Sequence, residues 1–147
     1  MALKEQLDGA MKSAMKARDN LRLSAVRMVR AAIKNREIDT HEELDDRAVT
    51  DVISTLVKQR RESIRMYREG NRPELADKEE LELSVLLEFL PAQLSSDEID
   101  ALVSRVIQDI GASSIKDMGR VMKAVTPLTA GKADGKVVSD TVRRLLA

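Results

Sequence analysis

The segment PAQLSSDE, at residues 91–98, divides the sequence into two helical parts. Pro91 has no backbone N–H and is disfavoured inside a helix, so the preceding helix is expected to stop there. Ser95 and Glu98 have the S-x-x-E spacing of a capping box, in which each side chain accepts a hydrogen bond from the other residue's backbone N–H at the start of a helix. The sequence therefore predicts two domains, residues 1–92 and residues 93–147.

Apolar residues follow helical spacing on both sides of this segment, and no stretch alternates long enough to predict a strand. Four helices are expected before the segment, over residues 3–17, 21–38, 47–69 and 73–90. Three shorter helices are expected after it, from the capping box to Gly111, over residues 114–125, and from residue 134 or 135 to 146. The predicted fold class is all-α, with a four-helix N-terminal bundle followed by a smaller three-helix C-terminal bundle.

Composition excludes several classes of function for this chain of 147 residues. The absence of cysteine rules out disulfides, thiol catalysis and cysteine-ligated zinc. Tyr67 and Phe89 are the only aromatic residues, too few for a surface that stacks several bases. No apolar run approaches the ~20 residues of a membrane span. We expect no membrane association and a cytoplasmic location, because Glu5 and Asp8 favour an ordinary core helix over a targeting peptide.

No catalytic constellation is recognisable. His41 is the only histidine, and the segment HEELD that it opens lacks the second histidine of a zinc-protease motif. Gly131 and Lys132 lack the earlier glycine and the following hydroxyl residue of a phosphate-binding loop. We predict no catalytic residue, no metal, no cofactor and no small-molecule substrate, and a protein that is not an enzyme by itself.

Charge is segregated along a chain with 25 basic and 25 acidic residues. The numbers of basic and acidic residues are nine and three over residues 1–36, one and seven over 37–57, six and two over 58–72, one and six over 74–88, and seven and three over 116–147. Mutual neutralisation is the simpler interpretation for the N-terminal bundle. The alternative is phosphate binding by the basic residues between Lys58 and Arg68, because arginine forks match phosphate as well as carboxylate.

The most unusual stretch covers residues 117–136. Gly119 lies inside an amphipathic helix, where glycine costs about 1 kcal/mol relative to alanine, so either close helix packing or the approach of a ligand would explain it. The turn expected over residues 126–134 places Gly131 where φ is positive and Asp134 where it caps the last helix. Basic residues gather around that turn, at Arg120, Lys123, Lys132 and Lys136. Together with a helix N-terminus, they are predicted to cradle the phosphates of folded RNA.

Several segments resemble the GatB/YqeY family, and in particular its free-standing YqeY-like members. They are RLSAVRM and AAIKN within residues 22–35, KQRRES at 58–63, LPAQLS at 90–95, MGRVM at 118–122 and GKADG at 131–135. The last pair is the most specific. It is similar to the end of the tail domain of the B subunit of the glutamine-dependent tRNA amidotransferase, where G-x-V-M-K-A leads shortly to G-K-A and then Asn or Asp.

The resemblance implies the four-helix plus three-helix architecture and contact with tRNA. It does not imply transamidation, because the amidase and ATP-using parts of that enzyme are absent from this sequence. The expected partners are tRNA and an amidotransferase or another protein. The alternative is a helical protein-protein adaptor with no nucleic-acid role. The candidate RNA-binding residues are Arg120, Lys123, Lys132 and Lys136 for phosphate contact, and Gly119, Gly131 and Gly135 for close approach.

Overall fold

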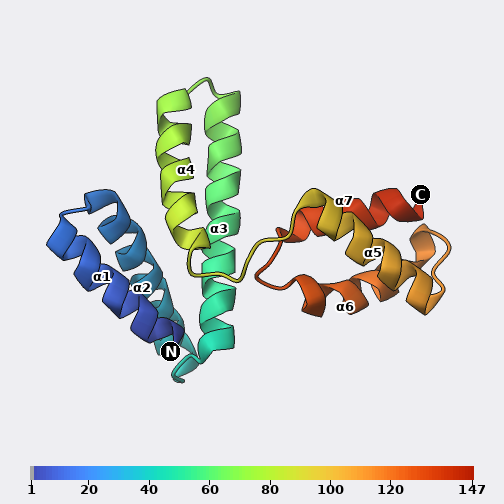
Figure 1. The fold of residues 1–147 in the computed structure, drawn as a ribbon, viewed down its shortest axis with the longest axis horizontal. Coiled ribbons are helices and arrows are strands. Elements are labelled where there is room, and N and C mark those ends of the chain that lie inside the picture. The colour runs from blue at the N-terminus through green and yellow to red at the C-terminus, as the bar shows by residue number, and fades with distance from the viewer. Residues whose placement is uncertain (1) are drawn as a thin grey trace. The chain divides into compact units, whose positions relative to one another are not determined.

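A computed structural model describes residues 2–147 and contains α-helices with no strand in that range. The predicted all-α class is confirmed, as is its grouping into a four-helix and a three-helix bundle (Figure 1). Contacts divide the chain into an N-terminal unit, Met1–Pro91, and a C-terminal unit, Ala92–Ala147. The helices are α1 (Leu3–Ala17), α2 (Asn20–Thr40), α3 (Asp46–Glu69), α4 (Pro73–Leu87), α5 (Ser96–Ile110), α6 (Met118–Thr129) and α7 (Gly135–Leu146), with a short 3-10 helix η1 (Ile115–Asp117) before α6.

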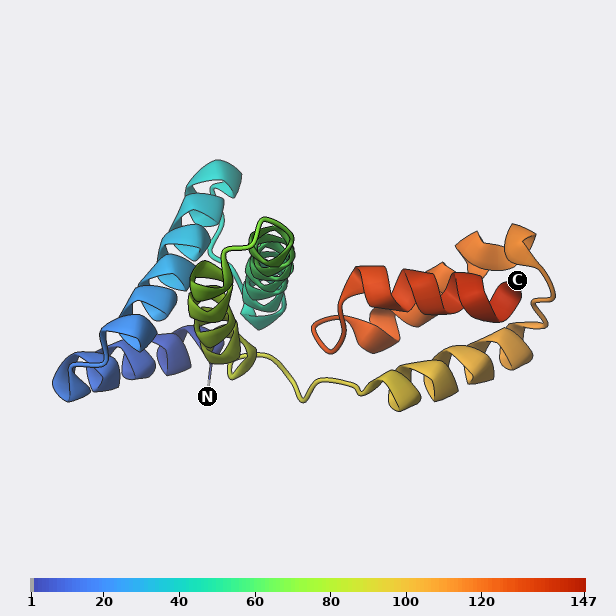
Figure 2. The same cartoon turned by 90° about the horizontal axis from the view of Figure 1, so that it is seen from above.

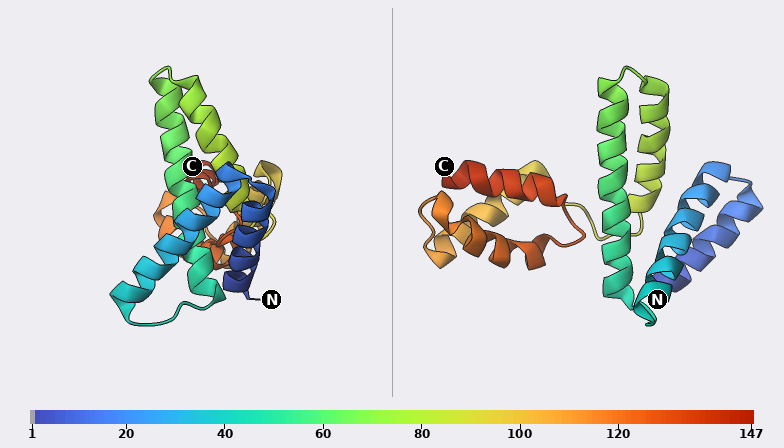
Figure 3. Two further views of the ribbon diagram at one scale, coloured as in Figure 1. Left: turned by 90° about the vertical axis from the view of Figure 1, so that its left-hand side faces the viewer. Right: turned by 180° about the vertical axis from the view of Figure 1, so that it is seen from behind.

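The N-terminal unit consists of two antiparallel hairpins, α1 with α2 and α3 with α4 (Figure 3). Its core is aliphatic, and α1 contributes Leu3, Leu7 and Ala14 to the buried residues. This burial confirms the prediction that the first helix is an ordinary core helix. The fully buried larger side chains of this unit are Leu7, Val26, Val29, Val49, Ile53 and Leu86.

The C-terminal unit packs α5, α6 and α7 around a core of small branched side chains (Figure 2). Its innermost residues are Val103, Val121, Val125, Val138 and Val142. The capping box predicted at the start of α5 is present, because Ser95 Oγ accepts from the Glu98 N–H at 3.2 Å and Glu98 Oε1 accepts from the Ser95 N–H at 3.1 Å. Gly111 ends this helix with a φ of 69°, which is typical of a helix C-terminus.

Three helix ends differ from the sequence prediction by three residues or more, namely the end of α4 and both ends of α6, which begins at Met118 after η1 and not at residue 114. α4 ends at Leu87 and not at residue 90, and the N–H groups of Glu88, Phe89 and Leu90 each bond to the carbonyl three residues earlier. This tighter turn agrees with the restriction that Pro91 places on the residue before it. α6 continues to Thr129 with Pro127 inside it, so the predicted turn over 126–134 begins only at residue 130. Pro127 lies in the last turn of the helix, where its missing N–H removes a single helical hydrogen bond.

Two negative findings apply to residues 2–147. No helix in this range combines the length and the apolar character that crossing a membrane requires. The same range holds no group of three or more His, Asp or Glu side chains placed to bind a metal ion.

Candidate nucleic-acid interface

The α6–α7 turn, residues 130–134, has a fixed backbone. Gly131 has a φ of 74°, which confirms the prediction of a positive φ at this glycine. The carbonyl oxygen of buried Thr129, at the end of α6, accepts hydrogen bonds from the N–H groups of Lys132 and Ala133, at 2.9 and 3.2 Å. From outside the turn, the Leu94 N–H donates to the Lys132 carbonyl at 2.8 Å, and Gln93 Nε2 donates to the Gly131 carbonyl at 2.8 Å. The turn therefore presents its side chains from a position set by four hydrogen bonds.

Asp134 caps α7, as the sequence predicted, because its Oδ1 atom accepts from the Lys136 N–H at 3.2 Å. The carboxylate thus takes one of the N–H groups that an anion would use at this helix N-terminus. Gly135 is the first residue of α7 and is exposed, and a Cβ atom built on it meets no atom within 4 Å. The sequence prediction gave part of the phosphate binding to this helix N-terminus. Because Asp134 already uses one of these N–H groups, phosphate binding would depend mainly on the lysine side chains.

Lys123 of α6, Lys132 of the turn and Lys136 at the start of α7 are exposed basic residues. Within residues 2–147, none of the three has a carboxylate oxygen within 4.0 Å, whereas Arg120, Arg143 and Arg144 of the same unit each pair with an aspartate. Lys132 and Lys136 lie at the turn itself. Lys123 lies six residues before the end of α6, or about 9 Å along the helix axis. Their ammonium groups are therefore available to a polyanion.

Arg120 lies apart from the turn. It is in the first turn of α6, nine residues from Thr129, which corresponds to about 13 Å along the axis. Its Nη2 atom is 3.4 Å from Asp117 Oδ1. The pKa of the Asp117 carboxyl is lowered, first by the N–H groups of Ser113 and Ser114 and then by Arg120, so this carboxylate is ionised at neutral pH. Arg120 is thus partly neutralised, and it does not join the lysines at the α6–α7 turn.

Gly119 lies beside Arg120 at the start of α6 and is exposed. A Cβ atom built on this glycine would meet no atom of residues 2–147 within 4 Å. Close helix packing, the first explanation that the sequence allowed for Gly119, is therefore wrong. The approach of a ligand stays a prediction for this residue. The open space also means that alanine would fit here without a clash.

The basic residues of α3 are largely neutralised within the N-terminal unit, as the simpler interpretation of the charge blocks predicted. Arg60 lies 3.0 Å from Glu79 and 3.2 Å from Glu82, both on α4. Arg68 lies 2.8 Å from Glu80 and also contacts Asp77, and Arg65 pairs with Glu62 and Glu69 on its own helix. Binding of phosphate by these arginines would require breaking existing ion pairs.

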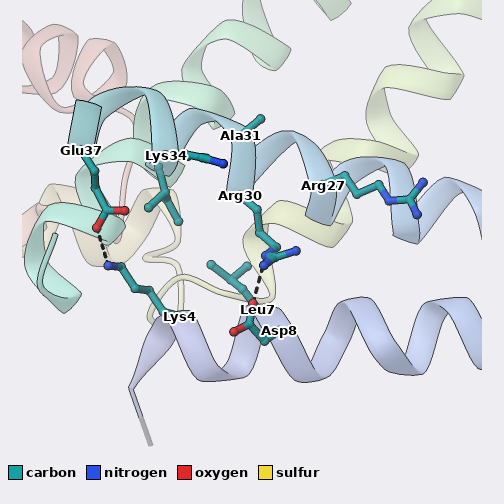
Figure 4. Close-up of a pocket in the computed structure, with 9 residues that line it drawn as sticks. Lys4, Leu7, Asp8, Arg27, Arg30, Ala31, Lys34 and Glu37 are labelled. Carbon is teal, nitrogen blue, oxygen red and sulfur yellow. Dashed lines mark hydrogen bonds and ion pairs between the residues drawn. The ribbon is translucent and has the colours of Figure 1, made fainter. Parts of the chain in front are cut away.

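The structure also shows a basic groove that sequence reasoning missed. It lies between α1 and α2, has a volume of about 520 Å³, and is lined on the α2 side by Arg27, Arg30 and Lys34 (Figure 4). These positions are spaced i, i+3 and i+7, so they share one face of a helix. That spacing was readable in the sequence. The count of basic and acidic residues over 1–36 did not show which of the basic residues share this face of α2.

Comparison with known proteins adds a family. A family model described as Yqey-like protein matches residues 4–146. The chain is 38% identical over 108 residues to Altered inheritance of mitochondria protein 41, mitochondrial, of Lachancea thermotolerans, over 71% of this chain and 57% of that protein. It is 37% identical over 115 residues to the protein of the same name from Kluyveromyces lactis, over 76% of this chain and 60% of that one. The match thus covers about three fifths of the length of these fungal relatives.

Proposed function

We propose that this chain, which belongs to the YqeY-like protein family, is a non-catalytic RNA-binding protein that holds the phosphate backbone of folded RNA at the α6–α7 turn. The observation that carries this proposal is the pair Lys132 and Lys136. Lys132 is exposed on a turn fixed by hydrogen bonds, Lys136 is exposed in the first turn of α7 directly after it, and neither has a carboxylate within 4.0 Å in the part of the chain that the structure describes. Unpaired cations on a rigid frame can contact phosphates without first breaking an internal ion pair.

The ligand class follows from the chemistry of these side chains. Lysine ammonium groups act as point charges without the planar fork of arginine, which suits them to contacts with phosphate oxygens. The C-terminal unit has no aromatic residue on which a base could stack. Recognition through Lys123, Lys132 and Lys136 would therefore depend on the shape and backbone of a folded RNA. The resemblance to an amidotransferase tail domain makes tRNA the first RNA to test.

The test is a fluorescence anisotropy titration of the full chain with unfractionated tRNA at several salt concentrations. Lys132→Glu combined with Lys136→Glu is expected to weaken binding more than tenfold and to lower the slope of log affinity against log salt by about 2, or about 1 per lost phosphate contact. Binding equal to that of the unmodified chain would remove the turn as the interface.

The matched control is Arg105→Glu combined with Lys116→Glu. These exposed residues belong to α5 and η1 of the same unit, and neither has a carboxylate within 4.0 Å among residues 2–147. The control changes the net charge by the same amount. It is expected to weaken binding less than threefold, because a local contact and not the total charge carries the interaction. An equal loss in both variants would show nonspecific attraction only.

A protein-protein adaptor is the second candidate. Leu128 and Val137, at the two helix ends beside the same turn, are 49% and 44% exposed. Apolar side chains beside lysines would also suit a protein partner. Recovery of one stoichiometric protein from a nuclease-treated lysate, together with no affinity for tRNA, would favour the adaptor. The cytoplasmic location expected from the sequence stays a prediction, since the fungal relatives are named as mitochondrial proteins.

A further inference from the structure

The α1–α2 groove carries positive charge that the N-terminal unit does not neutralise. Two of its cations are paired: Lys4 Nζ lies 2.5 Å from Glu37 Oε2, and Arg30 Nε lies 2.9 Å from Asp8 Oδ1. Figure 4 shows Lys4 reaching from α1 to Glu37 and Arg30 reaching from α2 to Asp8. Arg27 and Lys34 line the same groove, are exposed, and have no carboxylate within 4.0 Å between residues 2 and 147. The groove therefore has a positive balance along its α2 side.

The groove also presents its cations in a regular line. Arg27 and Lys34 are separated by seven residues of α2, which is about 10.5 Å along a helix, and Arg30 lies between them. Cations spread over this length of one helix can contact more than one phosphate of the same strand. The neighbouring face of α2 is anchored in the core by Val26 and Val29, which are fully buried. The line of cations is thus mounted on a rigid helix.

The lining favours phosphate groups over an acidic helix of a partner protein. A helix that docks in a groove needs apolar pockets for anchor side chains at i, i+3 and i+7. The larger apolar residues that line this groove, Leu7 and Ile33, are only 1% and 5% exposed, because they already pack in the core of the unit. Little apolar surface is left for such anchors. What the groove offers to a ligand is charge and hydrogen-bond donors.

We propose that the α1–α2 groove is a second site for the phosphate backbone of RNA, formed by the unpaired Arg27 and Lys34 in the N-terminal unit, with Arg30 between them held by its ion pair with Asp8. The choice of RNA as the polyanion rests on the proposed function, but the residues belong to a different unit and act separately from the α6–α7 turn. Two sites on one chain raise the overall affinity only for an RNA that reaches both of them, because the second contact is then intramolecular.

The experiment is the same anisotropy titration of the full chain with unfractionated tRNA. Arg27→Glu combined with Lys34→Glu is expected to weaken binding at least fivefold and to lower the salt slope by about 2. The control is Lys58→Glu combined with Lys78→Glu, which changes the charge of the same unit at exposed positions on α3 and α4. The control is expected to stay within twofold of the unmodified chain. Circular dichroism of each variant verifies that the helices are retained.

The results separate this inference from the proposed function. Loss of binding in the Lys132→Glu/Lys136→Glu variant, with no change in the Arg27→Glu/Lys34→Glu variant, overturns the groove and leaves the α6–α7 turn standing. The reverse pattern supports the groove and overturns the turn. If the groove variant is indistinguishable from its Lys58/Lys78 control, the groove is overturned. If Arg27→Glu combined with Lys34→Glu weakens the binding of poly-glutamate but leaves the binding of tRNA unchanged, the groove binds an acidic protein and the inference is wrong.

Discussion

The Leu94 N–H donates a hydrogen bond of 2.8 Å to the carbonyl oxygen of Lys132, and so ties the segment that opens the C-terminal unit to the turn that precedes α7. Gln93 reinforces this connection through its bond to the Gly131 carbonyl. Two of the segments that carry the family resemblance, residues 90–95 and 131–135, therefore meet in one local structure. The first stretch does more than separate two bundles, because it holds the backbone from which Lys132 projects.

Replacing Gln93 by alanine tests the support that this side chain gives to the turn, without changing any charge. The substitution removes the donor to the Gly131 carbonyl, a bond whose net contribution to stability is about 1 kcal/mol. We expect faster amide hydrogen exchange at the α6–α7 turn and a twofold to fivefold loss of tRNA affinity, since the lysines would sample more positions. Exchange measured by NMR for Lys132 and Ala133 checks the first expectation. Unchanged exchange there would show that the backbone bonds alone hold the turn.

Gly131 and Gly135 form a matched pair that separates backbone strain from packing. Gly131 has a φ of 74°, where a side chain is strained, so Gly131→Ala is expected to destabilise the C-terminal unit by about 1 kcal/mol. Gly135 has an ordinary helical φ and open space around its Cβ position, so Gly135→Ala is expected to be neutral or slightly stabilising. Chemical denaturation of both variants provides the comparison. Equal destabilisation would contradict the assigned role of the left-handed backbone.

Arg60 lies between two carboxylates of α4, and its side chain is 23% exposed while those of Glu79 and Glu82 are 17% and 14% exposed. Arg60→Met would leave these two partly buried carboxylates without their counter-ion. We expect a loss of about 3 kcal/mol in the free energy of unfolding of the N-terminal unit, since breaking one side of a buried ion cluster is more damaging than replacing it whole. Urea denaturation measures this loss.

The control for Arg60 is a triple variant in which Arg60, Glu79 and Glu82 are replaced by methionine, glutamine and glutamine. It removes the charges together, so much of the lost stability is expected to return. A triple variant as unstable as Arg60→Met would show that packing of the arginine side chain, and not its charge, supports the contact between α3 and α4.

Glu37 gives the N-terminal unit an acid-sensitive contact. Its pKa is lowered, first by the hydrogen bond from Lys4 and then by the Leu44 N–H at 2.8 Å. A carboxyl whose pKa is lowered on folding contributes stability above its unfolded pKa, and that contribution disappears as the pH falls through the folded value. We expect the urea midpoint of the N-terminal unit to fall as the pH drops below about 5. Glu37→Gln should flatten this part of the curve.

Glu43 supplies the comparison for Glu37. It lies 3.5 Å from the same Lys4 ammonium group, but its side chain is 88% exposed. Glu43→Gln is expected to leave the acid dependence of the urea midpoint nearly unchanged, because exposed ion pairs contribute little stability. If Glu43→Gln flattened the curve as much as Glu37→Gln, the effect would come from the total acidic charge around Lys4.

Several parts of the fold were predictable because the forces that decide them act between neighbours in sequence. The apolar spacing of α1 to α7, the side-chain cap at Ser95 and the positive φ of Gly131 depend on a few adjacent residues. The ends of α4 and α6 were predicted less well. The predicted fourth helix, placed up to Pro91, was too long, and the predicted sixth helix, which stopped before Pro127, was too short. The effect of a proline depends on which turn of a helix it occupies.

The amino-acid sequence by itself determined that the chain is all-α, that its helices group into two bundles, and which segments are basic or acidic. It could not determine which charges meet. Only tertiary packing decides that Arg60 faces two carboxylates, that Arg120 pairs with Asp117 away from the turn, and that Lys132 and Lys136 have no carboxylate within 4.0 Å among residues 2–147. The physical reason is the sequence separation over which each interaction acts. Helix formation depends on contacts within about four residues, whereas ion pairing depends on which helix faces lie together, and those are distant in sequence.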